Sequence, residues 1–412
     1  GLEEHALSEL RSARSRDANP ALEHAAKYAV WHSGDPVELA ERLLTHPNSS
    51  VAQAALEALA ERPEAAQRLI TREWVDQARN APDPDRRILA AVAVRLRPEG
   101  SDPAVLHGLL RDTDPRVTAA ACQTAATLQS RVHLEGLLRL LPNARFRQHA
   151  LDALASYGEK IAGTLGDILL DTSVPASVRR QIPRVLRRIS SQRSVDVLMA
   201  ALSEQDLTVR AQVLKALNSL REDNQKLNFG RDSVLKHIHD EARYYYTMSA
   251  ALKALGDNTE TPAARLLVKT LQERLRYTLE RLFRLLGLRY PPREIHAAFL
   301  AMSRKSGDQY TAAIEFLDNV LEREVKRFVL PLLDEDGRLN QVGRDLFGLA
   351  ELDHRGALRE LIRSGDAWLV ACAVSTAAEL GLNDLRPEIE TLAHKAGTEV
   401  GPVAQAALAR LA

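Results

Sequence analysis

The sequence predicts an all-α protein, an α-solenoid of about 13 helical hairpins wound into a superhelical array. Three observations predict this fold: a short helical word recurs along the chain, alanine and leucine dominate the apolar residues, and turn signals separate the recurrences. Hydrophobic residues make up 45% of the 412 residues, but aromatic residues only 4%. Because Ala and Leu are strong helix formers, this composition favours stacked helices with small side chains between them.

The recurring word is clearest near the two ends of the chain, as VAQAALEAL at 51–59 and VAQAALARL at 403–411. Its small or apolar residues at positions 1, 5 and 8–9 fall on one face of a helix. Thirteen starts span 382 residues in 12 steps, about 32 residues per step, which is typical of α-solenoids. The starts are Ala21, Val51, Arg87, Val117, Phe146, Val178, Val209, Thr247, Leu275, Tyr310, Leu339, Leu369 and Val403.

A second amphipathic segment precedes the word, so each unit is expected to be a pair of helices. Examples of this segment are 105–112, 132–141 and 194–204. Helix starts are marked by Asp-Pro, because the Asp side chain accepts hydrogen bonds from exposed N–H groups and Pro is tolerated at the first helical position. Asp-Pro occurs at 35–36, 83–84, 102–103 and 114–115. One hairpin cannot bury its apolar stripe, so stacking on its sequence neighbours should supply the core.

Two stretches interrupt the repeat. Residues 221–246 lengthen the step between the starts at Val209 and Thr247, and they contain the helix breakers Asn228 and Gly230. We therefore expect an irregular insertion or seam there, between an N-terminal array over 1–220 and a continuous C-terminal array over 247–412. In the second stretch, RYPPREI at 289–295, two prolines should end one helix and begin the next. The helix before them is expected to stop at Gly287.

Two segments, DTDPRVTAAACQTA at 112–125 and DLTVRAQVLKAL at 206–217, resemble the second helix of HEAT repeats. Residues 271–335 resemble more specifically the soluble HEAT-repeat extension of bacterial proteins of the ATP/ADP translocase family, which are nucleotide-transporter-like. This resemblance implies a cytosolic regulatory or docking region that is associated with a membrane transporter, with the transporter domain upstream in the same gene. It implies a cytoplasmic protein, tethered at the cytoplasmic face of the membrane. The transporter helices themselves are absent from these residues, so no transport residue carries over.

The charge is balanced, with 55 basic and 55 acidic residues, so no global field attracts the chain to an anionic partner. The Arg-rich stretch at 178–193 is the sharpest local feature. One interpretation is a surface for nucleic acid, lipid headgroups or an acidic protein, and its candidate residues are Arg180, Arg184, Arg187 and Arg188.

The other interpretation of the arginines is internal pairing. Position 2 of three successive words holds Arg147, Arg179 and Arg210. The HEAT resemblance implies a ladder in which such arginines pair with turn carboxylates, for example Asp171 or Asp206.

The sequence favours a protein-interaction scaffold over an enzyme. It contains neither HExxH nor GxSxG, so we expect no catalytic residue, no cofactor and no metal site. Cys122 and Cys372 are expected to be buried free thiols. The alternative function is nucleic-acid binding of the DNA-repair type through the Arg-rich edge, although the zero net charge and the scarce aromatic residues argue against it. The three tryptophans are expected to be packing residues; they are Trp31, Trp74 and Trp368.

Overall fold

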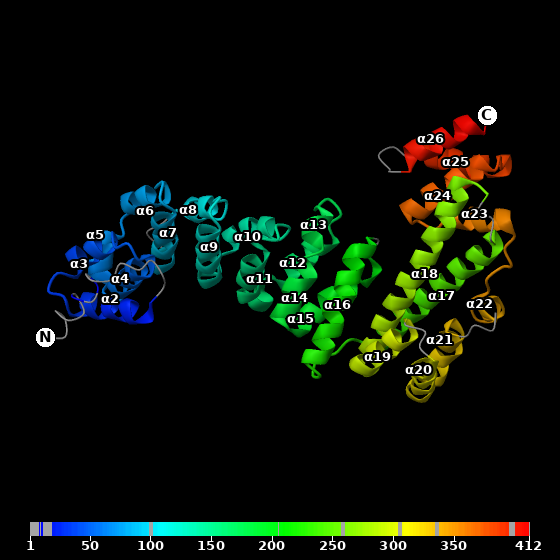
Figure 1. Ribbon diagram of the computed structural model, residues 1–412, viewed down its shortest axis with the longest axis horizontal. Helices are drawn as coiled ribbons and strands as arrows, with labels where there is room; N and C mark the ends of the chain where they lie inside the picture. The colour runs from blue at the N-terminus through cyan, green and yellow to red at the C-terminus, as the bar shows by residue number, and fades with distance from the viewer. Residues whose placement is uncertain are drawn as a thin grey trace. The chain divides into compact units, whose positions relative to one another are not determined.

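The computed structural model describes residues 8, 10, 19–98, 102–204, 206–256, 260–303, 307–333, 338–394 and 400–411. Over these residues the regular structure is helical, without a strand, which confirms the predicted all-α class. The chain divides into two compact units, Gly1–Ala216 and Leu217–Ala412 (Figure 1). The predicted seam at 221–246 and the arrays on either side of it stay predictions.

In the first unit, the recurring word lies on a row of helices that follow one another in chain order, which we call the B helices (Figure 1). Each B helix from α2 to α14 packs against the next one in the row. They are α2 (Pro20–His32), α4 (Ser49–Ala60), α7 (Pro84–Leu96), α9 (Pro115–Leu128), α11 (Arg147–Ser156), α14 (Ile182–Ile189) and α16 (Leu207–Asp223), the last of which runs across the boundary between the units. This is the stacking of an α-solenoid.

Shorter helices complete the hairpins of the first unit. They are α3 (Pro36–Leu43), α5 (Pro63–Leu69), α6 (Arg72–Arg79), α8 (Pro103–Leu109), η2 (Arg131–His133), α10 (Leu134–Leu140), η3 (Gly158–Ile161), α12 (Ala162–Leu170), α13 (Ala176–Arg179), α15 (Gln192–Ala200) and η4 (Ala201–Ser203). All four Asp-Pro pairs begin helices as predicted: each Asp side chain accepts a hydrogen bond from the backbone N–H two residues later. Fully buried alanines of the word, such as Ala55, Ala121 and Ala150, let the B helices approach closely.

The word that starts at Val178 is not one continuous helix. The segment breaks between α13 and α14, and the N–H of Gln181 donates to the carbonyl of Val178, a three-residue step. The cause is Pro183, which has no N–H to donate back along a continuous helix. Arg179 before the break is buried, whereas Arg180 is exposed.

The second unit is organised around two long helices that lie side by side, α17 (Arg231–Leu255) and α18 (Pro262–Arg289) (Figure 1). The remaining helices are α19 (Pro292–Ser303), α20 (Gly307–Val320), α21 (Arg323–Val329), η5 (Leu330–Leu332), α22 (Leu339–Phe347), α23 (His354–Ile362), α24 (Ala367–Glu379), η6 (Asn383–Leu385), α25 (Arg386–Ala393) and α26 (Gly401–Arg410). Helix α23 returns to pack against α17, and α24 against α18. Their core contains Met248, Leu267 and Leu271 together with Leu369 and Ala373.

The prediction of regularly spaced hairpins is therefore wrong for the second unit. Two repeat starts, Thr247 and Leu275, lie inside α17 and α18 rather than at a new hairpin. The prolines end α18 and begin α19 as predicted, but Gly287 does not stop the helix, which continues to Arg289. A Cβ at Gly287 would meet Oδ1 of Asn218 at 2.7 Å, so the glycine provides room for a neighbouring side chain.

Candidate functional site

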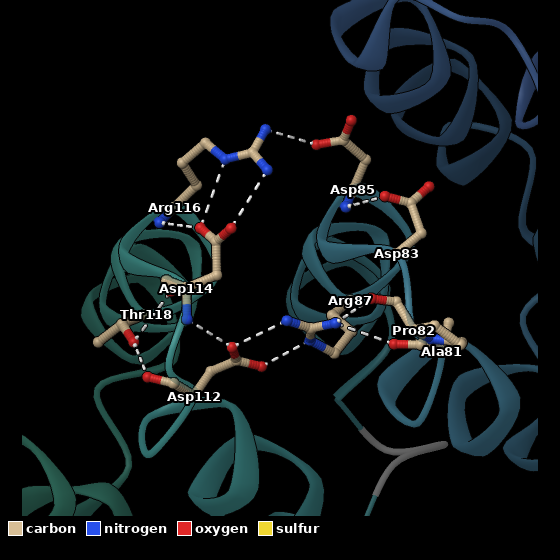
Figure 2. Close-up of polar contacts among 9 residues, drawn as sticks. All are labelled: Ala81, Pro82, Asp83, Asp85, Arg87, Asp112, Asp114, Arg116 and Thr118. Atoms are coloured by element: carbon tan, nitrogen blue, oxygen red, sulfur yellow. Dashed lines mark hydrogen bonds and ion pairs between the residues drawn. The ribbon is translucent and has the colours of Figure 1, made fainter.

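The hairpins of the first unit are joined at their turns by a ladder of arginines and carboxylates (Figure 2). Arg87 Nε and Nη2 donate to the two oxygens of Asp112, at 2.7 and 3.1 Å, and Nη1 donates to the carbonyls of Ala81 and Pro82. Asp112 also accepts the backbone N–H of Asp114. Burial is the largest single influence and raises the pKa of Asp112. The hydrogen bonds from Arg87 and from the backbone N–H of Asp114, together with the charge of Arg87, outweigh it and hold the pKa below its usual value.

A second, exposed rung lies beside the first (Figure 2). Arg116 contacts Asp114 of its own helix and Asp85 of the preceding B helix, the latter at 2.9 Å. The hydrogen bond from Arg116 lowers the pKa of Asp114. Because the Arg116 side chain is 57% exposed, water screens this rung and it contributes little to stability.

The ladder continues to Arg179, and this outcome decides between the two interpretations for that residue. Arg179 forms a buried ion pair with Glu204 in the turn before α16, and its Nε donates to the carbonyl of Leu169. The half-buried pair of Arg87 with Asp112 occupies the corresponding place before α9. The pairing interpretation holds for Arg179, but the partner is neither Asp171 nor Asp206. Those two carboxylates instead accept hydrogen bonds from the backbone N–H groups of the turns that follow them.

The other two word arginines differ from Arg179. Arg147 donates to the carbonyls of Leu141 and Pro142, the backbone part of the same arrangement. Arg210 is half-buried.

The four candidate arginines lie apart from the ladder. Arg180, Arg184, Arg187 and Arg188 are all exposed, and we call them the arginine face. Three of them are three and four residues apart on α14, so they project from one side of the helix. The opposite side of α14 carries Ile182, Val185 and Leu186, which are fully buried. The short helix is thus fixed in the stack by its apolar side and presents cations on the other.

A carboxylate of the neighbouring B helix contacts the arginine face. Arg188 Nε lies 3.3 Å from Oδ1 of Asp152, and Arg188 Nη2 donates to Oε1 of Gln148 at 3.1 Å. Both partners belong to α11, which packs directly against α14. The exposed residues of α11 are Gln148, His149, Asp152 and Ser156. The surface shared by α11 and α14 therefore offers charge and hydrogen-bonding groups, without a Phe, Tyr or Trp on which a base could stack.

An open hollow of about 440 Å³ near the N-terminal turns brings together His46, Asp83, Asp85 and Arg86. These are residue types that enzymes use, but three of the four have structural roles. One ring nitrogen of His46 lies 2.9 Å from the carbonyl of Leu10, and the other is 3.1 Å from the N–H of Asn48. Asp83 caps α7, and Asp85 pairs with Arg116. The hollow therefore offers no free acid–base pair built from these three residues.

The described residues hold no group of three or more His, Cys, Asp or Glu side chains placed to bind a metal ion. The cysteines are free and buried, as predicted. Burial raises the pKa of Cys122 to about 12 and raises that of Cys372 as well. Both thiols are thus protonated and weak nucleophiles at neutral pH. Among the helices that the structure describes, none has the length and apolar character that a bilayer span requires.

An exposed apolar stripe in the second unit was not predicted from the sequence. Trp368, expected as a packing residue, is 52% exposed, and its Nε1 donates to Oγ1 of Thr270 on α18. Leu266 and Tyr277, each 44% exposed, lie on the same side of α18 as Thr270 at helical spacing. The stripe joins residues about 100 positions apart, so only the packing of α24 on α18 could reveal it.

Neither a protein-family model nor the sequence of a curated protein matches this chain. Solved structures give weak likenesses. A mutant of Kap121p is 13% identical, with a TM-score of 0.38 over 100% of this chain and 48% of that one. A chain of a homology model of the AP-3 complex is 13% identical, with a TM-score of 0.29 over 99% and 90% of the two chains. An engineered protein is 17% identical, with a TM-score of 0.25 over 100% and 98%. At such TM-scores these likenesses add nothing to the fold that the helix contacts establish.

Proposed function

We propose that this protein is a non-enzymatic scaffold that binds another protein along the B helices of its first unit. Stacked hairpins build an extended surface rather than an enclosed pocket, and such surfaces suit elongated protein partners. The observation that carries the proposal is the arginine face, a local concentration of positive charge on a chain whose formal net charge is zero. Arginine is enriched at protein interfaces because its planar guanidinium can bind carboxylates through two hydrogen bonds.

Site-specific photo-crosslinking in the source cells tests the scaffold proposal. A crosslinker at Arg184 should capture a specific protein, whereas one at Glu159, which is exposed in the 3-10 helix before α12, should not. The captured protein is then purified and its Kd measured against the wild-type chain and the Arg184→Glu/Arg187→Glu variant. A Kd at least tenfold weaker in the variant supports the proposal. The proposal is contradicted if the wild-type chain and the variant bind the captured protein equally. It is also contradicted if only the crosslinker at Glu159 captures a protein.

We also propose that the partner is a nucleotide-transporter-like membrane protein, which would hold this chain at the cytoplasmic face of a membrane. The support is the resemblance of residues 271–335, which lie in the second unit. A purified transporter domain in nanodiscs should retain the full chain, and deletion of that domain should release the chain from the membrane fraction. If the chain stays in the membrane fraction after the deletion, this partner is excluded, while the scaffold proposal stays intact.

Nucleic-acid binding is the alternative, because guanidinium groups also bind phosphates. It would require affinity that falls steeply with salt concentration, measurable in a gel shift with single-stranded and duplex DNA. The absence of Phe, Tyr and Trp among the exposed residues of α11 and α14 disfavours it.

A further inference from the structure

The arginine face already contacts one carboxylate from a neighbouring helix. Asp152 of α11 lies 3.3 Å from the guanidinium of Arg188, and its side chain is 58% exposed. The same Asp152 carboxylate also accepts hydrogen bonds from Gln148, at 3.0 and 3.2 Å. Arg188 therefore points along the surface towards α11, and a carboxylate near this position can form an ion pair with it.

The pair is placed where a ligand could displace it. The side chains of Arg188 and Asp152 are 33% and 58% exposed, so water screens the contact and the ion pair is weak. Arg184 lies one helical turn before Arg188, a rise of about 6 Å along α14. A bound segment with carboxylates at a similar spacing could contact both arginines.

We propose that the arginine face binds an acidic peptide segment of a protein partner, and that Asp152 is a resident carboxylate that competes with this segment for Arg188. This inference rests on the proposed scaffold function and names the chemistry of the partner. Charge complementarity supports it: Arg184, Arg187 and Arg188 project from one side of α14, and the Asp152 carboxylate contacts Arg188. In the free protein the Asp152 carboxylate partly neutralises the face, and the bound segment would replace it.

The surface favours a peptide over nucleic acid for two reasons. Bases would find no Phe, Tyr or Trp side chain to stack on among the exposed residues of α11 and α14. The Asp152 carboxylate beside the arginines would also repel a continuous phosphate backbone, whereas a peptide can present its acidic residues on either side of Asp152.

The test uses the full chain and a fluorescein-labelled 12-residue peptide of alternating Glu and Ser, read by fluorescence anisotropy at low and high salt. The matched control peptide has Gln in place of Glu. We expect binding of the Glu peptide alone, weakened at least tenfold by Arg184→Glu/Arg187→Glu. Binding of both peptides alike, or binding that is unchanged in this variant, would overturn the proposal.

Asp152→Asn isolates the competing carboxylate. It should tighten binding of the Glu peptide about threefold to tenfold, because one like charge beside the site is removed. The matched control is Asp167→Asn, which removes the same charge from an exposed position on α12. If Asp152→Asn and Asp167→Asn change Kd equally, Asp152 has no specific role and the inference fails. Thermal melting checks that the fold of both variants is retained.

Two further ligands separate the remaining outcomes. A single-stranded oligonucleotide or an anionic lipid vesicle that binds more tightly than the Glu peptide, and is weakened by Arg184→Glu/Arg187→Glu, would replace the peptide as the occupant. If every anionic probe fails while crosslinking from Arg184 still captures a protein, this inference falls but the scaffold proposal stands.

Discussion

The polar contacts that hold the helices of each unit differ greatly in their reach along the chain. In the first unit the ladder joins neighbouring hairpins, as in Arg87 with Asp112 and Arg179 with Glu204. In the second unit Arg274 of α18 donates to Asp366, which is 92 residues away, and Trp368 donates to Thr270, which is 98 residues away. The first unit is therefore held by contacts between neighbouring hairpins, whereas the second is held by contacts between helices far apart in the sequence.

This difference predicts different modes of unfolding. In a stack of repeats, stability is approximately a sum over hairpins and their nearest neighbours, so damage stays local. Long-range contacts close large loops, so losing one removes order from all the helices in between. Three tryptophans report on the units separately: Trp31 and Trp74 lie in the first, and Trp368 lies in the second.

The largest effects are expected from two matched buried ion pairs, one in each unit. The side chains of Arg179 and Glu204 are 5% and 6% exposed, and those of Arg281 and Glu241 are 6% and 9% exposed. Replacing either arginine by alanine should cost about 3–5 kcal/mol, because a carboxylate loses its ion-pair partner in the interior. Hydrogen exchange should then show loss of protection confined to α12–α15 for Arg179→Ala, but spread over α17, α18, α23 and α24 for Arg281→Ala.

A control for these variants is Arg116→Ala, which removes the exposed rung and should cost less than about 1 kcal/mol. The proposed difference between the units is contradicted if Arg179→Ala also lowers hydrogen-exchange protection in α2 and α4. It is equally contradicted if α23 and α24 keep their protection in Arg281→Ala.

A smaller effect is expected where α24 begins. Arg274 binds Asp366 through two hydrogen bonds of 2.8 and 3.3 Å, and Asp366 also caps α24 by accepting the N–H groups of Trp368 and Leu369. Arg274→Ala should lower the free energy of unfolding of the second unit by about 2 kcal/mol. The urea midpoint read from Trp368 fluorescence, in a variant with Trp31 and Trp74 replaced by Phe, should fall. An unchanged midpoint would mean that this contact does not hold α24 on α18.

The first unit was largely predictable from its sequence because its signals are local. Asp-Pro marks helix starts such as Asp114, and the buried face of each word follows from its spacing, as in Val117 and Ala121. The turn ladder was expected only as a class of contact: the sequence suggested Asp171 or Asp206 for Arg179, and the partner is Glu204. Arg87 and Asp112 are 25 residues apart, and so are Arg179 and Glu204, a spacing that the expected Asp/Arg ladder did not include.

The second unit was harder to predict for a physical reason. The spacing that identifies a word at Thr247 or Leu275 continues through any long amphipathic helix, so it cannot tell a new hairpin from more of the same one. The exposure of Trp368 depends on which part of α18 receives α24, a contact across about 100 residues. The predicted role of the arginine face likewise stays a hypothesis, because exposure alone does not identify a ligand.

Two glycines should respond in opposite directions to replacement by alanine. At Gly287 in the second unit a Cβ would meet Oδ1 of Asn218 at 2.7 Å, and Asn218 is held by a hydrogen bond to the carbonyl of Arg284. We expect Gly287→Ala to destabilise the second unit by about 1 kcal/mol, the cost of overpacking less the gain in helix propensity. Gly108, in α8 of the first unit, has open space around it, so Gly108→Ala should stabilise by about 0.5–1 kcal/mol. Urea melts that show both variants shifting the same way would remove the packing role of Gly287.

The smallest effect is a difference in the acid response of the two units. His133 of the first unit is buried beside His107, with ring centroids 5.4 Å apart, and burial lowers its pKa below 6.5, with the charge of His107 adding to the shift. The unfolded chain therefore takes up the proton first, so the first unit should lose stability as the pH falls below about 6.5. In the second unit a hydrogen bond from Arg289 lowers the pKa of Glu322 below 4.5, so that contribution is lost only at more acidic pH. Between pH 7.5 and 5.5 the urea midpoint of the first unit should fall, and His133→Leu should abolish that fall, whereas a fall that persists in the variant would assign it to other groups.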